Sequence, residues 1–276
     1  MIVEVRDIWP LSLTEYGKFS PKNPLIWILN KIEQTAYRFA DDVVGTMPNL
    51  SEHISKFNRQ VDIHCIPIGF MSKAHYFANQ FKEWPTDLQE LSGKFVVGYF
   101  GKISRSSSME RILRVMEVLQ EHTNIVALIV GDGDLKQELQ RSYSSLKNVV
   151  WYRKISREEC WNLEGLCDLL IFSTGSDEVF KYGQSLNKVA EYMSVGRPIL
   201  GLYCGFQSMI NEAGCGKFIC SNDIDKIASE IKIFSEMTKN QLNEMGESGR
   251  LWLKANHSYE LLARRYLAII HKSLNE

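Results

Sequence analysis

KYGQSLNKVAEYMSVGRPILGL, residues 181–202, is the stretch that decides the fold. Ser185 is the expected N-cap of a helix, because its hydroxyl can accept a hydrogen bond from a first-turn amide. Gly196 suits the left-handed end of that helix, and Pro198 prevents it from continuing. The apolar residues at helical spacing predict one buried face; they are Leu186, Val189, Ala190 and Met193. The apolar run that follows, residues 198–203, predicts a buried strand.

The other face of this helix carries Asn187, Lys188 and Glu191. Free first-turn amides and the positive end of the helix dipole favour a phosphate group, and Lys188 adds a full charge. Glu191, one turn further along, could accept hydrogen bonds from two adjacent ribose hydroxyls. This pattern is typical of a nucleotide diphosphate site. An amphipathic helix with an ordinary Lys–Glu pair accounts for the same residues, and this helix taken alone favours that simpler interpretation.

Composition limits the class of protein. The length of 276 residues corresponds to one or two domains, and 45% apolar with 24% charged residues is typical of a soluble globular protein. The formal net charge of −1 gives no reason to expect nucleic acid as a partner. No segment approaches the ~20 apolar residues that span a membrane, and the N-terminus does not resemble a signal peptide. We therefore expect a cytoplasmic protein, in contact with a membrane at most peripherally.

The six cysteines contain no C-x-x-C pair and sit mostly in apolar segments. This pattern predicts buried free thiols in a reducing compartment and disfavours a disulfide framework. The six histidines show no ligand spacing, so we expect no metal site.

Strands alternate with helices through most of the chain, which predicts an α/β fold with a parallel sheet covered on both faces. The expected strands are residues 95–100, 125–130, 149–152, 168–172 and 198–203. Ligands of such sheets bind at the carboxyl ends of the strands, where Gly101, Lys102, Arg153 and Lys154 lie. The sequence GDGD at 131–134 lacks the G-x-G-x-x-G spacing of a dinucleotide site, and it fits a tight turn or a ligand-facing loop equally well.

The first 66 residues form a less complete pattern. Expected elements are a strand at 2–5, a helix at 24–39, a strand at 43–46 and a helix at 49–57. Two strands and two helices cannot cover both faces of a parallel sheet. This region therefore resembles the back half of a domain whose front half is absent. The sequence IPIG at 66–69 suits a crossing between domains, and the tail is expected to form helices at 223–237, 239–255 and 259–274, with Ser258 as the last N-cap.

Four segments in a fixed order resemble the C-terminal half of family 4 glycosyltransferases: VVGYFGKISRSSSMERIL, LIVGDGD, YRKISREE and KYGQSLNKVAEYMSVGRPIL. Residues 5–12 and 182–200 are similar to the O-antigen and capsule members of that family, which have the forms VRDLWPxS and YGxSPNKLFEYMAAGKPII. The resemblance implies a GT-B architecture, two Rossmann-like domains with the active site between them. It divides the chain into a partial acceptor-side N-terminal domain (1–66), a nucleotide-sugar-binding domain (67–257) and a helix packing back towards the N-terminal domain (258–276).

The resemblance also assigns roles to residues. It implies that Glu191 binds the ribose, and that Gly101 with Lys102 matches a Gly-Arg loop that meets the diphosphate. The backbone of residues 153–155 would hold the base. The diphosphate cradle would comprise Asn187, Lys188 and the amides after Ser185, including that of Leu186, and Arg153 and Lys154 would lie on the base side. The resemblance implies Lys102 and Lys188 as catalytic residues, together with Arg6 and Asp7, which occupy the place of the family's His-Asp pair on the N-terminal side of the cleft.

Three departures from the family pattern stand out. The first acid of the family's E-x7-E pair falls on Gly183, and the loop lysine falls on Ser107. The first strands and helices of the N-terminal domain are missing. We therefore expect either a truncated reading frame or a second polypeptide that supplies that half.

The function that the resemblance implies is transfer of a sugar, with retention at the anomeric carbon, from a nucleotide diphosphate donor, in particular UDP. The acceptor would be a glycan or lipid-linked molecule in surface polysaccharide synthesis, at the inner face of the membrane. No cofactor or metal is implied, because the protein stabilises charge on the leaving diphosphate. Two alternatives remain open: a non-catalytic nucleotide-sugar-binding fragment or partner subunit, and a sugar-nucleotide 2-epimerase on the same architecture.

Overall fold

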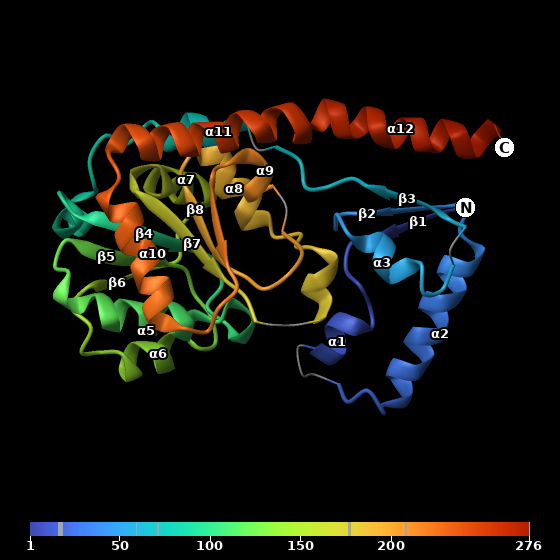
Figure 1. The fold of residues 1–276 in the computed structure, drawn as a ribbon, viewed down its shortest axis with the longest axis horizontal. Helices are drawn as coiled ribbons and strands as arrows, with labels where there is room; N and C mark the ends of the chain where they lie inside the picture. Colours follow the sequence, from blue (N-terminus) through green and yellow to red (C-terminus); the bar gives the residue numbers. More distant parts are fainter. Residues whose placement is uncertain (16–18, 59, 71, 176–177, 208, 276) are drawn as a thin grey trace.

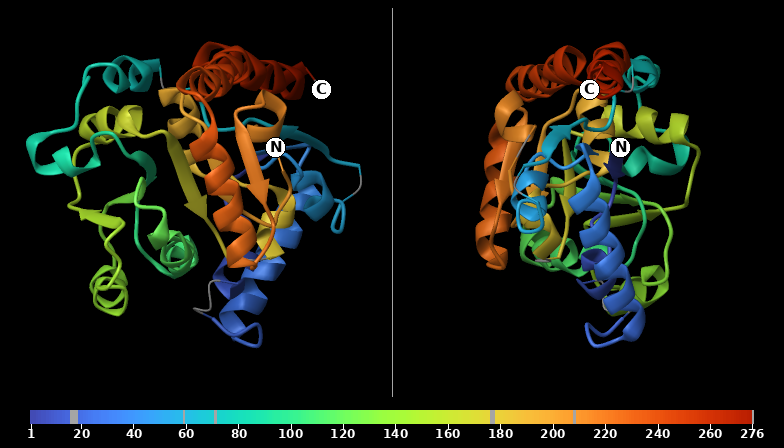
Figure 2. Two further views of the ribbon diagram at one scale, coloured as in Figure 1. Left: turned by 60° about the vertical axis from the view of Figure 1, so that its left-hand side comes forward. Right: turned by 90° about the vertical axis from the view of Figure 1, so that its right-hand side faces the viewer.

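The structure is a computed structural model that describes residues 1–15, 19–58, 60–70, 72–175, 178–207 and 209–275. It contains two parallel sheets, one with the order β1-β2-β3 and one with the order β6-β5-β4-β7-β8-β9 (Figure 1). The two sheets lie side by side, and the C-terminal helices run above both of them (Figure 2). The chain is thus an α/β protein with two sheet-centred units.

The larger unit is a doubly covered parallel sheet. Its strands are β4 (Phe95–Phe100), β5 (Ile125–Val130), β6 (Val149–Tyr152), β7 (Leu169–Ser173), β8 (Ile199–Leu202) and β9 (Gly216–Ile219). Helices α5 (Met109–Val118), α6 (Lys136–Ser142) and α10 (Ile224–Glu236) pack on one face. Helices α7 (Arg157–Leu166), α8 (Asn187–Val195) and α11 (Lys239–His257) pack on the other, with the short helices α4 (Ser72–Ala78) and α9 (Ile210–Ala213) beside them.

The sequence of β5, IVALIV, shows why these strands are apolar throughout. Its even-numbered residues, such as Leu128, pack with α7 and α8, while its odd-numbered residues, such as Ile129, pack with α5 and α10. All six residues of the strand are buried. A strand covered on both faces has no polar side, so it cannot show the alternation of a half-exposed strand.

The smaller unit contains β1 (Ile2–Val5), β2 (Asp42–Gly45) and β3 (Asp62–Cys65), with α1 (Leu11–Glu15), α2 (Pro24–Phe39) and α3 (Leu50–Ile54). Helix α2 has the predicted bounds, because Asn23 caps it by accepting a hydrogen bond from the Leu25 amide at 2.9 Å. Only its face with Ile26 and Tyr37 is buried. The opposite face leaves large apolar side chains exposed, namely Leu25, Trp27, Ile28, Ile32 and Phe39.

The tail helix α12 (Tyr259–Asn275) leaves the larger unit at the end of α11 and lies over the three-stranded sheet (Figure 1). The Ser273 hydroxyl donates to Asp42 Oδ2 at 2.7 Å, and the Tyr266 hydroxyl donates to Glu4 Oε2 at 3.4 Å. A second connection joins the turn after α3 to the short 3-10 helix Glu178–Tyr182 before α8, where Lys56 Nζ donates to the Tyr182 hydroxyl at 2.6 Å. Residues far apart in the sequence therefore hold the two units together.

Two predictions about local structure were incomplete or wrong. The strands β3 and β9 were not predicted; their sequences, DIHC and GKFI, contain no continuous apolar run of the kind seen in β5. The prediction of free thiols is wrong for Cys204 and Cys220, which form a disulfide. They follow the paired residues Leu202 and Ile219 at the ends of adjacent strands, so pairing in space, rather than spacing in sequence, brings them together. None of the helices in the described residues is long and apolar enough to cross a membrane.

Candidate active site

Two glycine-containing loops meet at the carboxyl ends of β4 and β5. The Gly101 amide donates to the Val130 carbonyl at 3.0 Å, and the Ile103 amide donates to the Asp132 carbonyl at 2.9 Å. Gly131 has φ +144°, and a Cβ atom on it would lie 1.9 Å from the Gly101 carbonyl oxygen. The GDGD sequence is therefore a tight turn whose first glycine allows the backbone of the Gly101 loop to approach.

Lys188, in the first turn of α8, reaches across to this loop. Its Nζ atom donates to the Tyr99 hydroxyl at 3.0 Å and lies 4.2 Å from the centroid of the Tyr99 ring. The Tyr99 hydroxyl donates in turn to the Lys102 carbonyl at 2.7 Å. A Cβ atom on Gly101 would lie 2.9 Å from Lys188 Nζ. The structure thus places Gly101 and Lys188, two predicted site residues, side by side, with the exposed Lys102 next in the same loop.

Tyr192 fixes α8 to the same strand one turn further along. This fully buried side chain accepts a hydrogen bond from the Phe100 amide at 2.9 Å and donates to the Phe100 carbonyl at 3.2 Å. The end of β4 and the start of α8 are therefore joined by two tyrosines, Tyr99 and Tyr192.

The start of α8 differs from the prediction. The helix begins at Asn187 with Leu186 as its N-cap, so the prediction that Ser185 caps it is wrong. The side-chain oxygen of Gln184 accepts a hydrogen bond from the Leu186 amide at 3.2 Å, so Gln184 rather than Ser185 binds the backbone here. Ser185 and Leu186 are half-buried, and Asn187 is exposed in the first turn. The Val189 amide donates to the Leu186 carbonyl at 3.0 Å, so the amides of Asn187 and Lys188 are the ones at this helix end that suit an anion.

Glu191 lies on the next turn of α8 and pairs with a residue of α7. Its Oε1 atom lies 3.4 Å from Arg157 Nε, and its side chain is 21% exposed. Burial raises the pKa of Glu191, while the charges of Arg157 and Lys188 act in the opposite direction. Within the described residues Lys188 and Glu191 form no ion pair with each other, because each has another partner.

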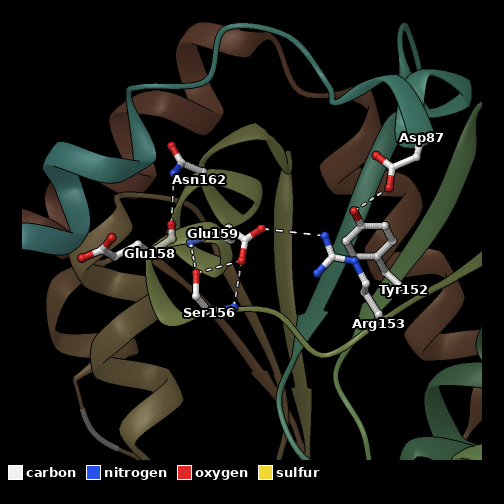
Figure 3. Close-up of polar contacts among 7 residues, drawn as sticks. All are labelled: Asp87, Tyr152, Arg153, Ser156, Glu158, Glu159 and Asn162. Carbon is white, nitrogen blue, oxygen red and sulfur yellow. Dashed lines mark hydrogen bonds and ion pairs between the residues drawn. The ribbon is translucent and has the colours of Figure 1, made fainter.

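Arg153 and Lys154 follow β6 in the chain. Figure 3 shows Arg153 between Tyr152 and Glu159. The Arg153 guanidinium lies 5.2 Å from the Tyr152 ring centroid and 3.8 Å from Glu159 Oε1. Glu159 itself accepts hydrogen bonds from the amide and hydroxyl of Ser156, which forms a capping box at the start of α7. Lys154 is exposed. The Arg153 side chain is thus directed along the rim of the sheet. The backbone after β6, rather than this side chain, lies at the carboxyl end of the strand.

Arg6 and Asp7 follow β1 in the smaller unit. Arg6 lines a cavity of about 500 Å³ together with Asn187, so the structure brings one predicted residue from each unit to a common space. The Arg6 guanidinium also pairs with Glu4 at 2.8 Å, which raises its pKa. Asp7 is exposed, accepts a hydrogen bond from Trp9 Nε1 at 3.1 Å, and does not line this cavity.

The two departures within the site region have structural reasons. Gly183 has φ +113°, and a Cβ atom there would lie 2.4 Å from Pro48 of the smaller unit, so the position has no room for an acidic side chain. Ser107 is buried in a short turn, where its hydroxyl donates to the Ser104 carbonyl at 2.7 Å and accepts from the Ser104 amide at 3.1 Å. It therefore holds the loop after Lys102 in place.

Sequence reasoning missed the side chains that support the site from other elements. Tyr99, Tyr192, Gln184 and Arg157 were not singled out, although Tyr99 stands two residues before Gly101 at the end of an apolar strand. A tyrosine hydroxyl so near the carboxyl end of a strand is a signal that could have been used. Their partners lie far away in sequence and appear only in the fold.

The comparisons with known proteins agree with this fold. Residues 80–252, more than half of the chain, match the family model described as glycosyl transferases group 1. The chain belongs to the glycosyl transferases group 1 family. No curated protein matches the sequence.

Among solved structures, this glycosyltransferase chain is similar to the sucrose-phosphate synthase of Thermosynechococcus elongatus, at 16% identity and a TM-score of 0.73, over 99% of this chain and 68% of that one. Anabaena HepE, solved with UDP and glucose, is 15% identical, with a TM-score of 0.69, over 98% of this chain and 71% of that one. WaaG, a glycosyltransferase involved in lipopolysaccharide biosynthesis, is 14% identical, with a TM-score of 0.68, over 96% and 73%. At these identities the likeness shows a common GT-B fold.

Glu164 of α7 provides a test of the buried region beside α8. Its carboxyl is fully buried, Oε2 has no hydrogen-bond partner, and burial raises its pKa well above the usual range, with the charge of Glu191 adding to the effect. The folded chain keeps this proton at pH values where the unfolded chain has lost it, so stability falls as pH rises above about 4.3.

Glu164→Gln should remove this fall in stability with rising pH. We expect the melting temperature of the variant, relative to the wild type, to be higher at pH 8 than at pH 5, with each kcal/mol giving about 2–4 °C. An unchanged difference between the two pH values would show that Glu164 does not carry a buried proton.

Proposed function

We propose that this glycosyltransferase takes a sugar from a UDP-linked donor and transfers it, with retention at the anomeric carbon, to a glycan or lipid-linked acceptor in surface polysaccharide synthesis. One observation carries the donor part of the proposal: the Lys188 ammonium lies beside Gly101, at the start of α8. An ammonium, helix amides and a close glycine loop together suit a diphosphate. HepE, solved with UDP and glucose, supports the choice of nucleotide.

In this proposal the larger unit binds the donor, and residues 1–66 with the tail helix face the acceptor. Lys102, Lys188 and the first-turn amides of α8 stabilise the charge that grows on the leaving diphosphate, without a cofactor or metal. Preorganised charges of this kind need no rearrangement during the reaction, because Tyr99 already holds Lys188 in place. Arg6 approaches from the other unit, on the acceptor side. Location in the cytoplasm, at the inner face of a membrane, stays a prediction.

The main test is the affinity for UDP. Lys188→Ala should weaken UDP binding by about 1.5–3 kcal/mol, or about 10- to 150-fold, the range for hydrogen bonds to charged groups. Calorimetry measures this directly. The matched control is Lys217→Ala. It removes a lysine of strand β9 that pairs with Glu230 of α10, and this variant should bind UDP as the wild type does. Equal UDP affinity in a folded Lys188→Ala variant would refute the diphosphate assignment.

The ribose assignment makes a separate prediction. If Glu191 accepts hydrogen bonds from both ribose hydroxyls, 2′,3′-dideoxy-UDP should bind about 10-fold or more weakly than UDP. The preference for UDP over the dideoxy nucleotide should decline as pH falls, because only the carboxylate form of Glu191 accepts both hydrogen bonds. The decline should start above the usual pKa range of glutamate, because burial raises the pKa of Glu191. Glu191→Gln should reduce the preference. Equal binding of the two nucleotides would leave Glu191 as the partner of Arg157 only.

A second candidate function is that of a partner subunit in a split enzyme. Two observations favour it: β1 is an edge strand of a parallel sheet, and α2 exposes Trp27 and Phe39 at 63% and 67%. Parallel sheets are normally covered and apolar patches of this kind are typical of interfaces. A further polypeptide segment that pairs with β1 and covers α2 would complete the acceptor side.

A further inference from the structure

The disulfide between Cys204 and Cys220 lies at the surface, at the carboxyl ends of two adjacent strands. Both cysteines are exposed, and they follow the paired residues Leu202 of β8 and Ile219 of β9. A reductant in solution can therefore approach the disulfide without unfolding of the chain. Exposed disulfides are typically the labile or regulatory ones, whereas protected disulfides resist reduction.

Strand pairing keeps the two cysteine positions together independently of the covalent bond. The Tyr203 amide donates to the Ile219 carbonyl at 3.1 Å, so the ladder between β8 and β9 reaches the residue before Cys204. The Cα atoms of Cys204 and Cys220 lie 4.4 Å apart. Because this ladder remains after reduction, the two thiols stay adjacent and have a high effective concentration for each other. The pair is thus suited to reversible oxidation.

The loop after Cys204 packs against the segment that leads to α8. The Phe206 amide donates to the Phe180 carbonyl at 2.9 Å, and the Tyr203 hydroxyl donates to the same carbonyl at 2.8 Å. A Cβ atom on Gly205 would lie 2.3 Å from that carbonyl oxygen, so the two backbones are closely packed. Phe180 belongs to the 3-10 helix that directly precedes the start of α8. The disulfide therefore holds a loop that supports the segment before α8.

The segment after Cys220 borders the loop that carries Lys102. The Asn222 side-chain oxygen accepts a hydrogen bond from the Arg111 guanidinium of α5 at 2.9 Å. Asn222 also lines a cavity of about 540 Å³ together with Ser104, which stands two residues after Lys102. The disulfide thus joins two segments, one packed before the start of α8 and one beside the Lys102 loop.

We propose that Cys204 and Cys220 are a redox-active pair, reduced by dithiols and reoxidised by disulfides, whose oxidation state controls how firmly these two segments are held. A thiolate of the dithiol attacks one sulfur of the pair, the S–S bond breaks, and the other cysteine leaves as a thiolate that takes up a proton. The second thiol of the dithiol, after losing its proton, attacks the mixed disulfide and releases the remaining cysteine. The dithiol leaves as a disulfide, and the pair has gained two electrons and two protons.

Oxidation of the pair also favours donor binding, because both segments border the candidate donor site; this part rests on the proposed function. The experiment equilibrates the full chain in dithiothreitol buffers of graded reduction potential, without denaturant. Free thiols are blocked and assigned to each cysteine by peptide mass spectrometry, and calorimetry gives the UDP affinity of the oxidised and reduced chains.

We expect Cys204 and Cys220 to be reduced together in the folded chain, and the reduced chain to bind UDP about 5-fold or more weakly than the oxidised chain. Because coupling between two equilibria is reciprocal, saturating UDP should lower the reduction potential of the pair by the same factor. For 5-fold this is about 20 mV, since a tenfold change corresponds to about 30 mV for two electrons. The variant with both Cys204→Ser and Cys220→Ser should bind UDP as the reduced wild type does, whatever the buffer.

Cys65→Ser, which removes an exposed free cysteine, is the control and should respond to dithiothreitol as the wild type does. Hydrogen exchange in residues 178–184 and 203–206 gives a readout that needs no nucleotide, and reduction should accelerate it. The inference is wrong if the disulfide does not form in oxidising buffer, if it opens only in the unfolded chain, or if exchange there is the same in both states. Equal UDP affinity of the two states would refute the coupling. Accelerated exchange without any UDP binding would refute the donor proposal and support the redox-active pair.

Discussion

The 276-residue chain is expected to bind UDP and yet to transfer no sugar when it is the only polypeptide present. The predicted donor contacts lie in the larger unit, whose six-stranded sheet is covered on both faces. Transfer also needs an acceptor held beside the donor, and orientation of this kind supplies roughly 7–11 kcal/mol of barrier lowering. If the acceptor side is incomplete, most of that contribution is lost.

The state of the smaller unit is the reason for this expectation. Its sheet has three strands, with β1 at one edge, and α2 buries only one face while Trp27 and Phe39 stay exposed. The solved GT-B structures match nearly the whole of this chain, but the chain spans 68–73% of the three described above. Those proteins therefore contain chain beyond the part that this one matches.

Turnover and binding should be measured on the same preparation. We expect UDP binding by calorimetry, together with no release of UDP from a panel of UDP-sugars and lipid-linked glycan acceptors. UDP-glucose hydrolysis in the absence of acceptor is the control for slow background release. Robust transfer by the purified chain, with no second polypeptide present, would show that the smaller unit is sufficient for acceptor binding.

Gly131→Ala should have the largest effect on stability of any small substitution at the site. The new Cβ atom would lie 1.9 Å from the Gly101 carbonyl oxygen, at φ +144°. We expect a loss of about 1–3 kcal/mol from the backbone conformation, which L residues rarely adopt, and about 1–3 kcal/mol from the forced movement of the loop. At this chain length the melting temperature should fall by on the order of 10 °C. UDP affinity should fall as well, because the Gly101 loop, which carries the predicted diphosphate residues Gly101 and Lys102, must move.

Gly93→Ala is the control without a close contact. Gly93 also has a positive φ, +75°, but nothing lies within 4 Å of its Cβ position. This variant should lose only the conformational part, about 1–2 kcal/mol, and should bind UDP normally. If thermal unfolding gives the same loss for both variants, the close approach between the two loops is not important for stability.

The long apolar elements could be predicted from the sequence because local pattern and tertiary packing agree there. Helix α2 has a cap at Asn23 and a proline in its first turn, and both of its bounds were predicted. Strand β5 is apolar throughout because it is covered on both sides. The strand GKFI of β9 gives no such signal, since its stability comes from pairing with β8 rather than from its own residues.

The candidate site could be predicted only in part. The pattern around Lys188 and Gly101 indicated residues that the fold does bring together, since both lie at strand or helix ends. The residues that hold them, Tyr99 and Gln184, act across elements, so no local spacing reveals them. Ser185 was predicted as the cap because its residue type is favoured there, but the side chain before it satisfies the backbone instead.

Hydrogen exchange of the chain with and without UDP tests the central claim most directly. If the carboxyl ends of β4 and β6 and the start of α8 bind the nucleotide, UDP should slow exchange in residues 101–103, 153–155 and 186–191. Exchange in residues 19–58 should change little, because the smaller unit is not predicted to contact the nucleotide. The predicted result is slower exchange in residues 101–103, 153–155 and 186–191. Saturating UDP with unchanged exchange there, or with protection confined to the smaller unit, would contradict it.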